Sequence, residues 1–309
     1  MRWSPHPLSL RQLQYVVAVA ERGSFRRAAE QCHVSQPSLS AQVAQLEEAL
    51  GVQLFERDRR RVLLTPAAEG LIRRARQLLV EADDLVDAAA QLADPFAGKL
   101  RVGIIPTISP YLLPEIAPAL RLAFPRLRIL WSEDRTARLA AALWAGELDA
   151  ALVALEAELG DVEHEVIGRD AFVLASAPTH PLARSSRLLR PAELENADVL
   201  LLEDGHCLRD QALAVCGNAQ LRESEFRATS LATLTQMVAG SQCVTLLPSL
   251  AVAAENRRDD LRIRRFAKPA PGRTLALVWR RGAAAERSLR RIGEVVRGSY
   301  EKLLRRRPA

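Results

Sequence analysis

The sequence has no uninterrupted apolar run that approaches the roughly 18 to 20 residues needed to cross a bilayer. Its first residues, MRWSPHPLSLRQ, also lack the apolar segment of a secretory signal peptide. We therefore expect a cytoplasmic protein with no membrane contact. Cysteine is scarce as well, because the 309 residues contain only Cys32, Cys207, Cys216 and Cys243. This number excludes a disulfide scaffold, and a disulfide in a cytoplasmic protein would be transient or sensory rather than structural.

Lysine is also rare, since only three of the 43 basic residues are lysines, which we attribute to the base composition of the coding sequence. Apolar residues, in contrast, make up 49% of the chain. At this length and composition the chain can form at least two domains with cores of their own. The formal net charge of +6 favours an anionic partner, although many soluble proteins share such a balance.

The N-terminal segment has the spacing of three short helices. Apolar residues recur at helical intervals over residues 8–20, and Gly23 ends this first helix. Ser24 is placed to cap a second helix and Ser35 a third, which runs to about Leu50. Two short helices joined by a tight turn make a helix-turn-helix, whose second helix can enter a DNA major groove.

Polar residues at the start of the third helix are the candidates for DNA contact. Gln36 and Gln42 can read base edges, whereas Ser38 and Ser40 are better suited to phosphates. Residues 55–64, FERDRRRVLL, follow as a predicted wing. Its arginines would equally suit a solvated turn, but their place beside a helix-turn-helix favours phosphate contact. The candidate DNA-contacting residues are Arg27, Ser35, Gln36, Pro37, Ser38, Ser40, Gln42, Arg57 and Arg59.

The stretch SFRRAAEQCHVSQPSLSAQVAQLEEALGVQLFER resembles the DNA-binding domain of LysR-type transcriptional regulators, and the match runs from about Leu8 to Gly70. As a motif it is highly specific. The resemblance implies a winged helix-turn-helix domain at residues 1–65 and a regulator, not an enzyme, that binds double-stranded promoter DNA. Cys32 lies beside the turn, where a small buried thiol of the core is the better explanation.

A long helix is predicted to start at Thr65 and Pro66 and to reach about Ala93, so that residues 66–93 form a linker helix. Leucines stand seven residues apart along it with alanines between them, as in a coiled-coil seam: Leu71, Leu78, Leu85 and Leu92, with Ala75, Ala82 and Ala89. This stripe could instead pack on the chain's own effector domain, but its narrow pattern favours self-association. LysR-type regulators dimerise through this helix and commonly form dimers of dimers, which implies a homotetramer and pseudo-palindromic DNA sites.

Residues 94–99, DPFAGK, are expected to form a hinge, because Pro95 and Gly98 interrupt the helix. From Leu100 onward, strand-like segments alternate with helical ones, which favours a parallel α/β sheet. Around residues 162–169 the chain crosses into a second, similar unit, and it returns through TLALVWRR and a C-terminal helix at residues 284–304.

Two α/β lobes joined by two crossovers resemble the periplasmic-binding-protein-like effector domain of the LysR family, which holds a ligand between its lobes. The expected fold class is therefore α/β with an all-α winged helix-turn-helix N-terminal domain. The two-lobed regulatory domain would span residues 100–309. Lobe I is expected at about 100–164 and 271–309, and lobe II at about 165–270.

The segment LLLEDGHCLRDQALAVC, residues 200–216, carries one cysteine in a polar turn and a second nine residues later. Between them the chain has helical apolar spacing and contains neither Gly nor Pro. In a helix, Cys207 and Cys216 would stand roughly 13 to 14 Å apart. A disulfide needs Cα atoms about 4.4 to 6.8 Å apart. A bond between them would therefore require the helix to unwind, and oxidation would become a conformational switch.

Several loops resemble those of OxyR regulators, the peroxide-sensing branch of the LysR family: IPTISPYLLPEIAP, LEDGHCLRDQAL, FRATSLATL and TLLPSLAV. By this resemblance Cys207 is the peroxidatic cysteine and Cys216 the resolving one, while Thr107, Thr136 and Arg273 belong to the hydrogen peroxide site. The resemblance implies an activator of the oxidative-stress response that works with RNA polymerase and is reset by cellular thiol reductants, without metal or cofactor.

The residue types suit that chemistry. A thiolate attacks the O–O bond to give a sulfenic acid, which a nearby thiol converts into a disulfide. A cysteine at the start of a helix gains thiolate character from the helix dipole. His206 and Asp210 stand beside Cys207 as a possible proton acceptor and hydrogen-bonding group. A threonine hydroxyl can both donate to a peroxide and accept from it.

Each of these residues also has a plainer explanation. Thr107 and Thr136 could simply cap helices, His206 could be a satisfied turn histidine, and Asp210 could be a cap or ion-pair residue. Cys243 lies in an apolar run and fits the core. For the whole protein, a LysR-type regulator of a small metabolite with incidental cysteines is the alternative. A thiol peroxidase is the weaker one, because it would leave the helix-turn-helix without a purpose.

Overall fold

The computed structural model describes residues 6–57, 62–94, 96–216 and 222–306, apart from a few side chains within these ranges. The chain forms two compact units, residues 1–90 and 91–309. None of the helices in the described ranges is long and apolar enough to cross a membrane.

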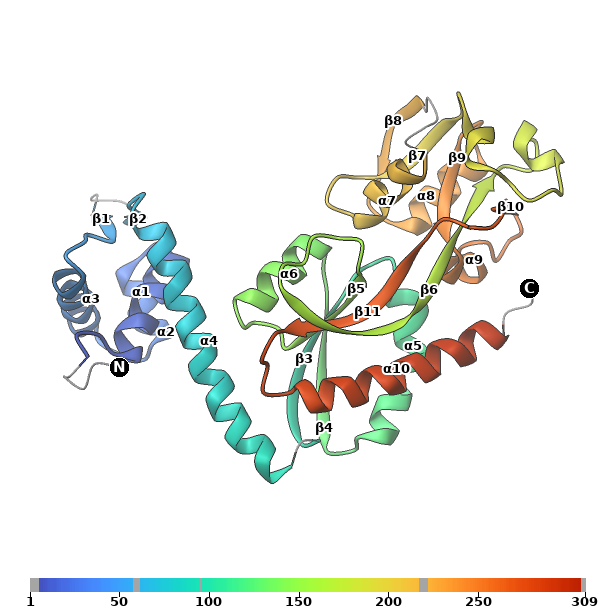
Figure 1. Ribbon diagram of the computed structural model, residues 1–309. Helices are drawn as coiled ribbons and strands as arrows, with labels where there is room; N and C mark the ends of the chain where they lie inside the picture. The colour runs from blue at the N-terminus through green and yellow to red at the C-terminus, as the bar shows by residue number, and fades with distance from the viewer. Residues whose placement is uncertain (1–5, 58–61, 95, 217–221, 307–309) are drawn as a thin grey trace. The chain divides into compact units, whose positions relative to one another are not determined.

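The first unit begins with three short helices, α1 (Leu10–Arg22), α2 (Phe25–Gln31) and α3 (Gln36–Leu50) (Figure 1). Local signals set their ends. Ser9 and Gln12 form a reciprocal capping box at the start of α1, and Gly23 ends it in the left-handed conformation with φ 58°. The Ser24 and Ser35 hydroxyls cap α2 and α3, so the predicted helix-turn-helix is confirmed.

Two short antiparallel strands, β1 (Phe55–Arg57) and β2 (Val62–Leu64), follow α3 and form the wing. Phe55 is buried and meets Phe25 of α2 edge to face, with ring centroids 5.8 Å apart. The wing is therefore fixed to the helical core by aromatic packing.

Helix α4 (Ala68–Ala93) supplies one part of the predicted leucine seam. Leu78 is 45% exposed and Leu85 is 73% exposed, so these two leucines are uncovered within the unit. Ala75, which the heptad pattern places on the same seam, is instead buried in the core of the helix-turn-helix. The reason is that α4 turns a second face, which includes Ile72, towards that core. The side chain of Leu92 lies outside the described residues.

The second unit is built on one continuous sheet with the strand order β4-β3-β5-β11-β6-β9-β7-β8, and β10 pairs with β6. Its strands are β3 (Gly98–Ile104), β4 (Leu127–Glu133), β5 (Ala150–Ala154), β6 (Val162–Ser176), β7 (Asp198–Leu202), β8 (Arg222–Ala228), β9 (Val244–Pro248), β10 (Arg262–Arg265) and β11 (Gly272–Arg280). Because β3 starts at Gly98, the last two residues of the expected hinge belong to a strand.

The expectation of a parallel sheet is correct only within each lobe. Strands β3, β4 and β5 are parallel, as are β7, β8 and β9. The two strands that connect the lobes, β6 and β11, are antiparallel to their neighbours. The sheet is mixed because a chain that leaves a lobe and returns to it must run in opposite directions.

Strand β6 passes from one lobe to the other. It pairs with β11 as far as Ala171 and with β9 from Phe172 onward, so the change of lobe lies at residues 171–172. The sequence estimate of about residue 165 falls on this same strand. Figure 1 shows β6 and β11 running side by side between the lobes.

Helices cover the faces of both lobes. Lobe I carries α5 (Ser109–Ala123), α6 (Thr136–Trp144) and α10 (Glu286–Arg306), and lobe II carries α7 (Cys207–Cys216), α8 (Leu231–Ala239) and α9 (Ser249–Glu255). Helix α10 passes close to β6 at Gly293, where a Cβ atom would lie 2.5 Å from Cγ of Glu165. All five residues of the central strand β5 are buried, as its continuous apolar run predicts.

Candidate functional site

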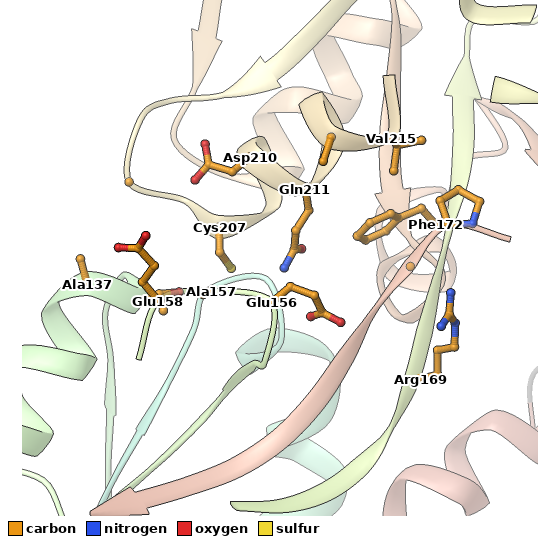
Figure 2. Close-up of a pocket in the computed structure, with 15 residues that line it drawn as sticks. Ala137, Glu156, Ala157, Glu158, Arg169, Phe172, Cys207, Asp210, Gln211 and Val215 are labelled. Atoms are coloured by element: carbon orange, nitrogen blue, oxygen red, sulfur yellow. The ribbon is translucent and has the colours of Figure 1, made fainter. Parts of the chain in front are cut away.

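Cys207 is the first residue of α7 and follows the turn that leaves β7. Its side chain is half-buried and lines a cavity of about 790 Å³ between the lobes. The cavity is lined by Thr136, Ala137, Glu156, Ala157, Glu158, Arg169, Phe172, Gly205, Cys207, Asp210, Gln211, Ala214, Val215, Pro271 and Gly272. Figure 2 shows the Cys207 thiol and the Gln211 amide pointing into this space above Glu156.

Two side chains in the cavity wall have buried polar atoms without a hydrogen-bond partner. Thr136 is only 6% exposed, and its Oγ1 atom has no partner. The Oε1 and Nε2 atoms of Gln211 are also buried and have no hydrogen-bond partner. Buried polar groups are normally satisfied, so this wall offers both donors and acceptors to a small polar molecule.

The plainer explanation of the two threonines as helix caps is wrong. The N-cap residue of α5 is Ile108 and that of α6 is Arg135, and neither helix has a side-chain cap hydrogen bond. Thr107 stands before the cap of α5, and Thr136 is the first residue of α6.

Thr107 belongs to a buried polar cluster with Arg273 and Asp170. Arg273 on β11 and Asp170 on β6 are direct cross-strand partners, and both side chains are fully buried. The Arg273 guanidinium donates to the Thr107 hydroxyl at 2.6 Å, to the Thr107 carbonyl at 2.9 Å, and to the Asp170 carboxylate at 3.1 and 3.2 Å. The other Asp170 oxygen accepts from the Ser249 hydroxyl at 2.9 Å and from the Leu250 amide at 3.0 Å.

His206 precedes Cys207 and is buried. Burial lowers the pKa of His206, and the positive charge of Arg135 lowers it further. The neutral form of its imidazole is therefore favoured, and the same shift makes His206 a weaker proton acceptor than an ordinary histidine. Arg135 comes from the other lobe, where it is the N-cap residue of α6.

The two residues after Leu208 differ in their surroundings. Arg209 is buried and forms ion pairs with Glu223 at 2.7 Å and with Asp204 at 3.0 Å. These hydrogen bonds and charges raise the pKa of Arg209, with the Glu223 hydrogen bond as the largest cause. Asp210 is exposed and lines the cavity. The start of α7 is thus held by Arg209, while Asp210 faces the cavity.

The structure brings together only some of the residues predicted for the site. Thr136, Cys207 and Asp210 line the cavity, whereas Thr107, His206 and Arg273 are not among its lining residues. Cys216 is the last residue of α7, and its side chain lies outside the described residues. Because α7 is a helix, Cys207 and Cys216 are about 13 to 14 Å apart along its axis.

Sequence reasoning missed Gln211, Asp170 and Arg135. Gln211 could have been found, because residues four apart on a helix share a face and Cys207 starts this one. Asp170 and Arg135 carry no local signal, since their partners stand 103 and 68 residues away.

In the first unit, most of the predicted DNA-contacting residues lie on α2 and in the first half of α3. Arg27, Gln36, Pro37 and Ser38 are exposed, as is Ser35. The Ser35 hydroxyl accepts from the Ser38 amide at 3.3 Å, so it caps the helix. Ser40 and Gln42 are half-buried. Arg59 and the side chain of Arg57 lie outside the described residues.

The remaining described cysteines are Cys32 and Cys243, both half-buried and packed against apolar cores, as expected. Burial raises the pKa of the Cys32 thiol, which makes it less reactive. Within the described ranges, no group of three or more His, Cys, Asp or Glu side chains is placed to hold a metal ion.

Two family models match the chain. The LysR substrate binding domain matches residues 93–300, and the bacterial regulatory helix-turn-helix protein, lysR family, matches residues 10–69. The chain belongs to the LysR family. A hydrogen peroxide-inducible genes activator from Dickeya chrysanthemi is 44% identical over 297 residues, which cover 96% of this chain and 93% of that protein.

Within the LysR family the chain belongs to the OxyR branch. The DNA-binding transcriptional dual regulator OxyR of Escherichia coli K12 is 42% identical over 303 residues, covering 96% of this chain and 99% of that protein. A full-length cysteine-to-aspartate variant of OxyR from Pseudomonas aeruginosa has a TM-score of 0.76 at 34% identity, with 94% of this chain and 95% of that one covered.

A hydrogen peroxide-bound cysteine-to-serine variant of Corynebacterium glutamicum OxyR has a TM-score of 0.65 at 32% identity, with coverage of 97% and 94%. The resemblance to LysR-type and OxyR regulators is therefore confirmed, as is the fold class. Like these relatives, the protein is a transcription regulator and not an enzyme.

Proposed function

We propose that this LysR-family regulator activates transcription of an oxidative-stress response when hydrogen peroxide oxidises Cys207. The observation that carries the proposal is the wall around that thiol. Cys207 lines a cavity whose neighbouring polar atoms, the Thr136 hydroxyl and the Gln211 amide, have no partner in the protein. A bound peroxide both donates and accepts hydrogen bonds, so it would satisfy these groups.

The first chemical step would be attack of the Cys207 thiolate on one peroxide oxygen. The sulfur gains a bond to oxygen, the O–O bond breaks, and the departing hydroxide takes up a proton to become water. Cys207 is the first residue of α7, so the positive end of the helix dipole lies beside its sulfur. Burial and the charge of Arg135 lower the pKa of His206, so next to Cys207 it would act as a neutral hydrogen-bonding group rather than as a strong base.

The second step would be attack of the Cys216 thiol on the sulfenic acid, which forms the disulfide and releases water. Both cysteines are in α7, so the helix must unwind before their Cα atoms come within the roughly 4.4 to 6.8 Å of a disulfide. This unwinding would convert the local reaction into a change in the effector domain. Cellular thiol reductants would return the protein to the dithiol form in the cytoplasm.

The output of this switch would be at promoter DNA. The exposed start of α3, with Gln36 and Ser38, suits major-groove contact, and Arg27 on α2 suits phosphate. The exposed Leu78 and Leu85 of α4 would form the dimer seam, and two dimers would bind a pseudo-palindromic site as a tetramer. We propose that the oxidised tetramer engages RNA polymerase.

A metabolite regulator remains the competing function, because the cavity volume suits a small organic molecule. The lining argues against the organic anion that LysR effector domains usually bind. Three carboxylates, Glu156, Glu158 and Asp210, line the cavity beside a single guanidinium, that of Arg169. An anion would meet net repulsion there.

Replacement of Cys207 by Ser tests the proposal. Peroxide-dependent transcription from a bound promoter should fall to the background level, and mass spectrometry of peroxide-treated wild-type protein should find a Cys207–Cys216 linkage. Cys243→Ser is the matched control, since Cys243 packs against the core, and it should respond like the wild type. A full response in Cys207→Ser would contradict the role of Cys207, whereas a wild-type protein without any peroxide response would favour the metabolite regulator. Multiple turnover of peroxide with a thiol donor would favour a peroxidase.

A further inference from the structure

Arg135 reaches from lobe I to the turn that carries Cys207. Its guanidinium pairs with the Glu203 carboxylate and donates a second hydrogen bond to the Asp204 carbonyl at 3.1 Å. Both acceptors belong to lobe II, between β7 and α7. One side chain therefore holds the two residues just before the Gly205–His206–Cys207 sequence.

The contact is closely packed as well as charged. Gly205 has φ +91°, a conformation that favours glycine, and a Cβ atom at this position would lie 3.3 Å from Cδ of Arg135. The Arg135 side chain thus lies against the backbone of the turn. Its charge also reaches the site, since it contributes to the lowered pKa of His206.

The turn held by Arg135 is connected to α7 through further ion pairs. The Asp204 carboxylate pairs with Arg209 of α7 at 3.0 Å and with Arg227 of β8 at 2.7 Å. Arg209 in turn pairs with Glu223 of β8 at 2.7 Å. The network therefore runs from α6 of lobe I, through the turn, to the first turn of α7, the part that must unwind before a disulfide can form.

We propose that Arg135 is a positioning residue that holds the Cys207 turn in its dithiol arrangement across the lobe boundary. This inference rests on the proposed function. When α7 unwinds, the turn moves and the Arg135 contacts are lost, so these contacts stabilise only the dithiol state. Their removal shifts the equilibrium towards the disulfide, because a contact made in one of two states changes their ratio.

The test is the thiol–disulfide equilibrium of the full-length protein with glutathione. In this reaction the Cys207 and Cys216 thiols lose two electrons and two protons, and one glutathione disulfide becomes two glutathione thiols. We expect Arg135→Gln to raise the equilibrium constant for disulfide formation about three- to tenfold, the range for a partly exposed ion pair with one additional charged hydrogen bond.

Three further variants separate positioning from a general loss of structure. Arg138→Gln removes an exposed arginine from the first turn of α6 and should leave the equilibrium constant unchanged. Arg135→Lys keeps the charge and should restore part of the wild-type value. The exchange Arg135→Glu with Glu203→Arg should restore more of it than either single change. An unchanged constant in Arg135→Gln, or an equal rise in Arg138→Gln, would overturn the inference.

Hydrogen exchange of the reduced protein gives a second readout that does not depend on oxidation. Arg135→Gln should increase exchange at residues 203–209 and leave the β5 amides protected. If the wild type forms no Cys207–Cys216 disulfide, the proposed function fails, and exchange alone decides the inference. Unchanged protection at residues 203–209 in Arg135→Gln would then refute it.

Discussion

Two polar regions of the second unit were both predicted to belong to the hydrogen peroxide site. In the structure, the buried polar groups of one region have hydrogen-bond partners and those of the other have none. The buried Arg273 guanidinium donates hydrogen bonds to the Asp170 carboxylate, which is also buried, and to the Thr107 hydroxyl. Around Cys207, the Thr136 hydroxyl and the Gln211 amide are buried without partners. The first region holds β6, β11 and the start of α5 together, while the second faces an open cavity.

The presence or absence of hydrogen-bond partners indicates whether a buried polar residue serves stability or ligand binding. Fully connected buried polar groups make a region rigid, whereas groups left without a partner cost free energy unless a ligand supplies one. Thr107 and Thr136 look alike in the sequence, yet the hydrogen bonds of their hydroxyls separate them. We therefore expect substitutions in the two regions to affect different measurements.

The largest effect on stability is expected for Arg273→Met. It leaves the Asp170 carboxylate buried without its cation, which typically lowers the free energy of unfolding by about 3 to 5 kcal/mol. Urea denaturation of the full chain, followed by the fluorescence of the buried Trp279, measures this loss. Arg128→Met, on an exposed position of β4, is the control and should change stability by less than about 0.5 kcal/mol. If both variants lost the same free energy of unfolding, the Arg273 region would have no special role in stability.

Thr107→Val and Thr136→Val should change stability less than Arg273→Met does. They compare the two regions directly, because the same residue type is replaced in each. Thr107→Val leaves the Arg273 donor without its hydroxyl acceptor and should cost about 1 to 3 kcal/mol. Thr136→Val removes an unpartnered hydroxyl and should leave stability unchanged or slightly higher. It should instead slow Cys207 oxidation by peroxide roughly 100-fold, the cost of one lost donor in a reactive site.

Rapid-quench mass spectrometry of the Cys207 thiol measures that rate at low peroxide concentration. Should Thr136→Val react at the wild-type rate and lose stability like Thr107→Val, the two threonines would have the same structural role. The contrast between the regions would then have no functional meaning.

The smallest expected effect is the pH dependence contributed by His206. Its pKa in the folded protein lies below the ordinary 6.5, so the unfolded state binds a proton at a higher pH than the folded state does. Stability from this residue is thus complete above about 6.5 and is lost as pH falls below that value, by about 1 kcal/mol or less at pH 5.5. His206→Asn should reduce this decline, whereas His164→Asn, at an exposed position, should not. A decline that survives in His206→Asn would assign it to other groups.

Much of the fold could be predicted because its signals are local. The hydroxyls of Ser24 and Ser35 cap α2 and α3 as predicted, and Gly23 ends α1 with a positive φ. The helix between Cys207 and Cys216 was predicted from its apolar spacing and its lack of Gly and Pro, and the structure confirms it. Less could be predicted for α4, where Ala75 belongs to a different face from the exposed leucines.

The sequence by itself determined most of the helices, the caps of α2 and α3, the two cysteines at the ends of one helix, and the family resemblance, since each depends on neighbouring residues. Only the tertiary structure decided which polar groups are satisfied. The Arg273 to Thr107 hydrogen bond joins residues 166 apart, and the Arg135 to Glu203 pair joins residues 68 apart. Such partners meet only because the sheet places the end of β3 near β11, with β5 between them, and because Arg135 of lobe I reaches the turn before Cys207 in lobe II. Local spacing carries no information about that pairing, which is why Thr107 and Thr136 could not be told apart from the sequence.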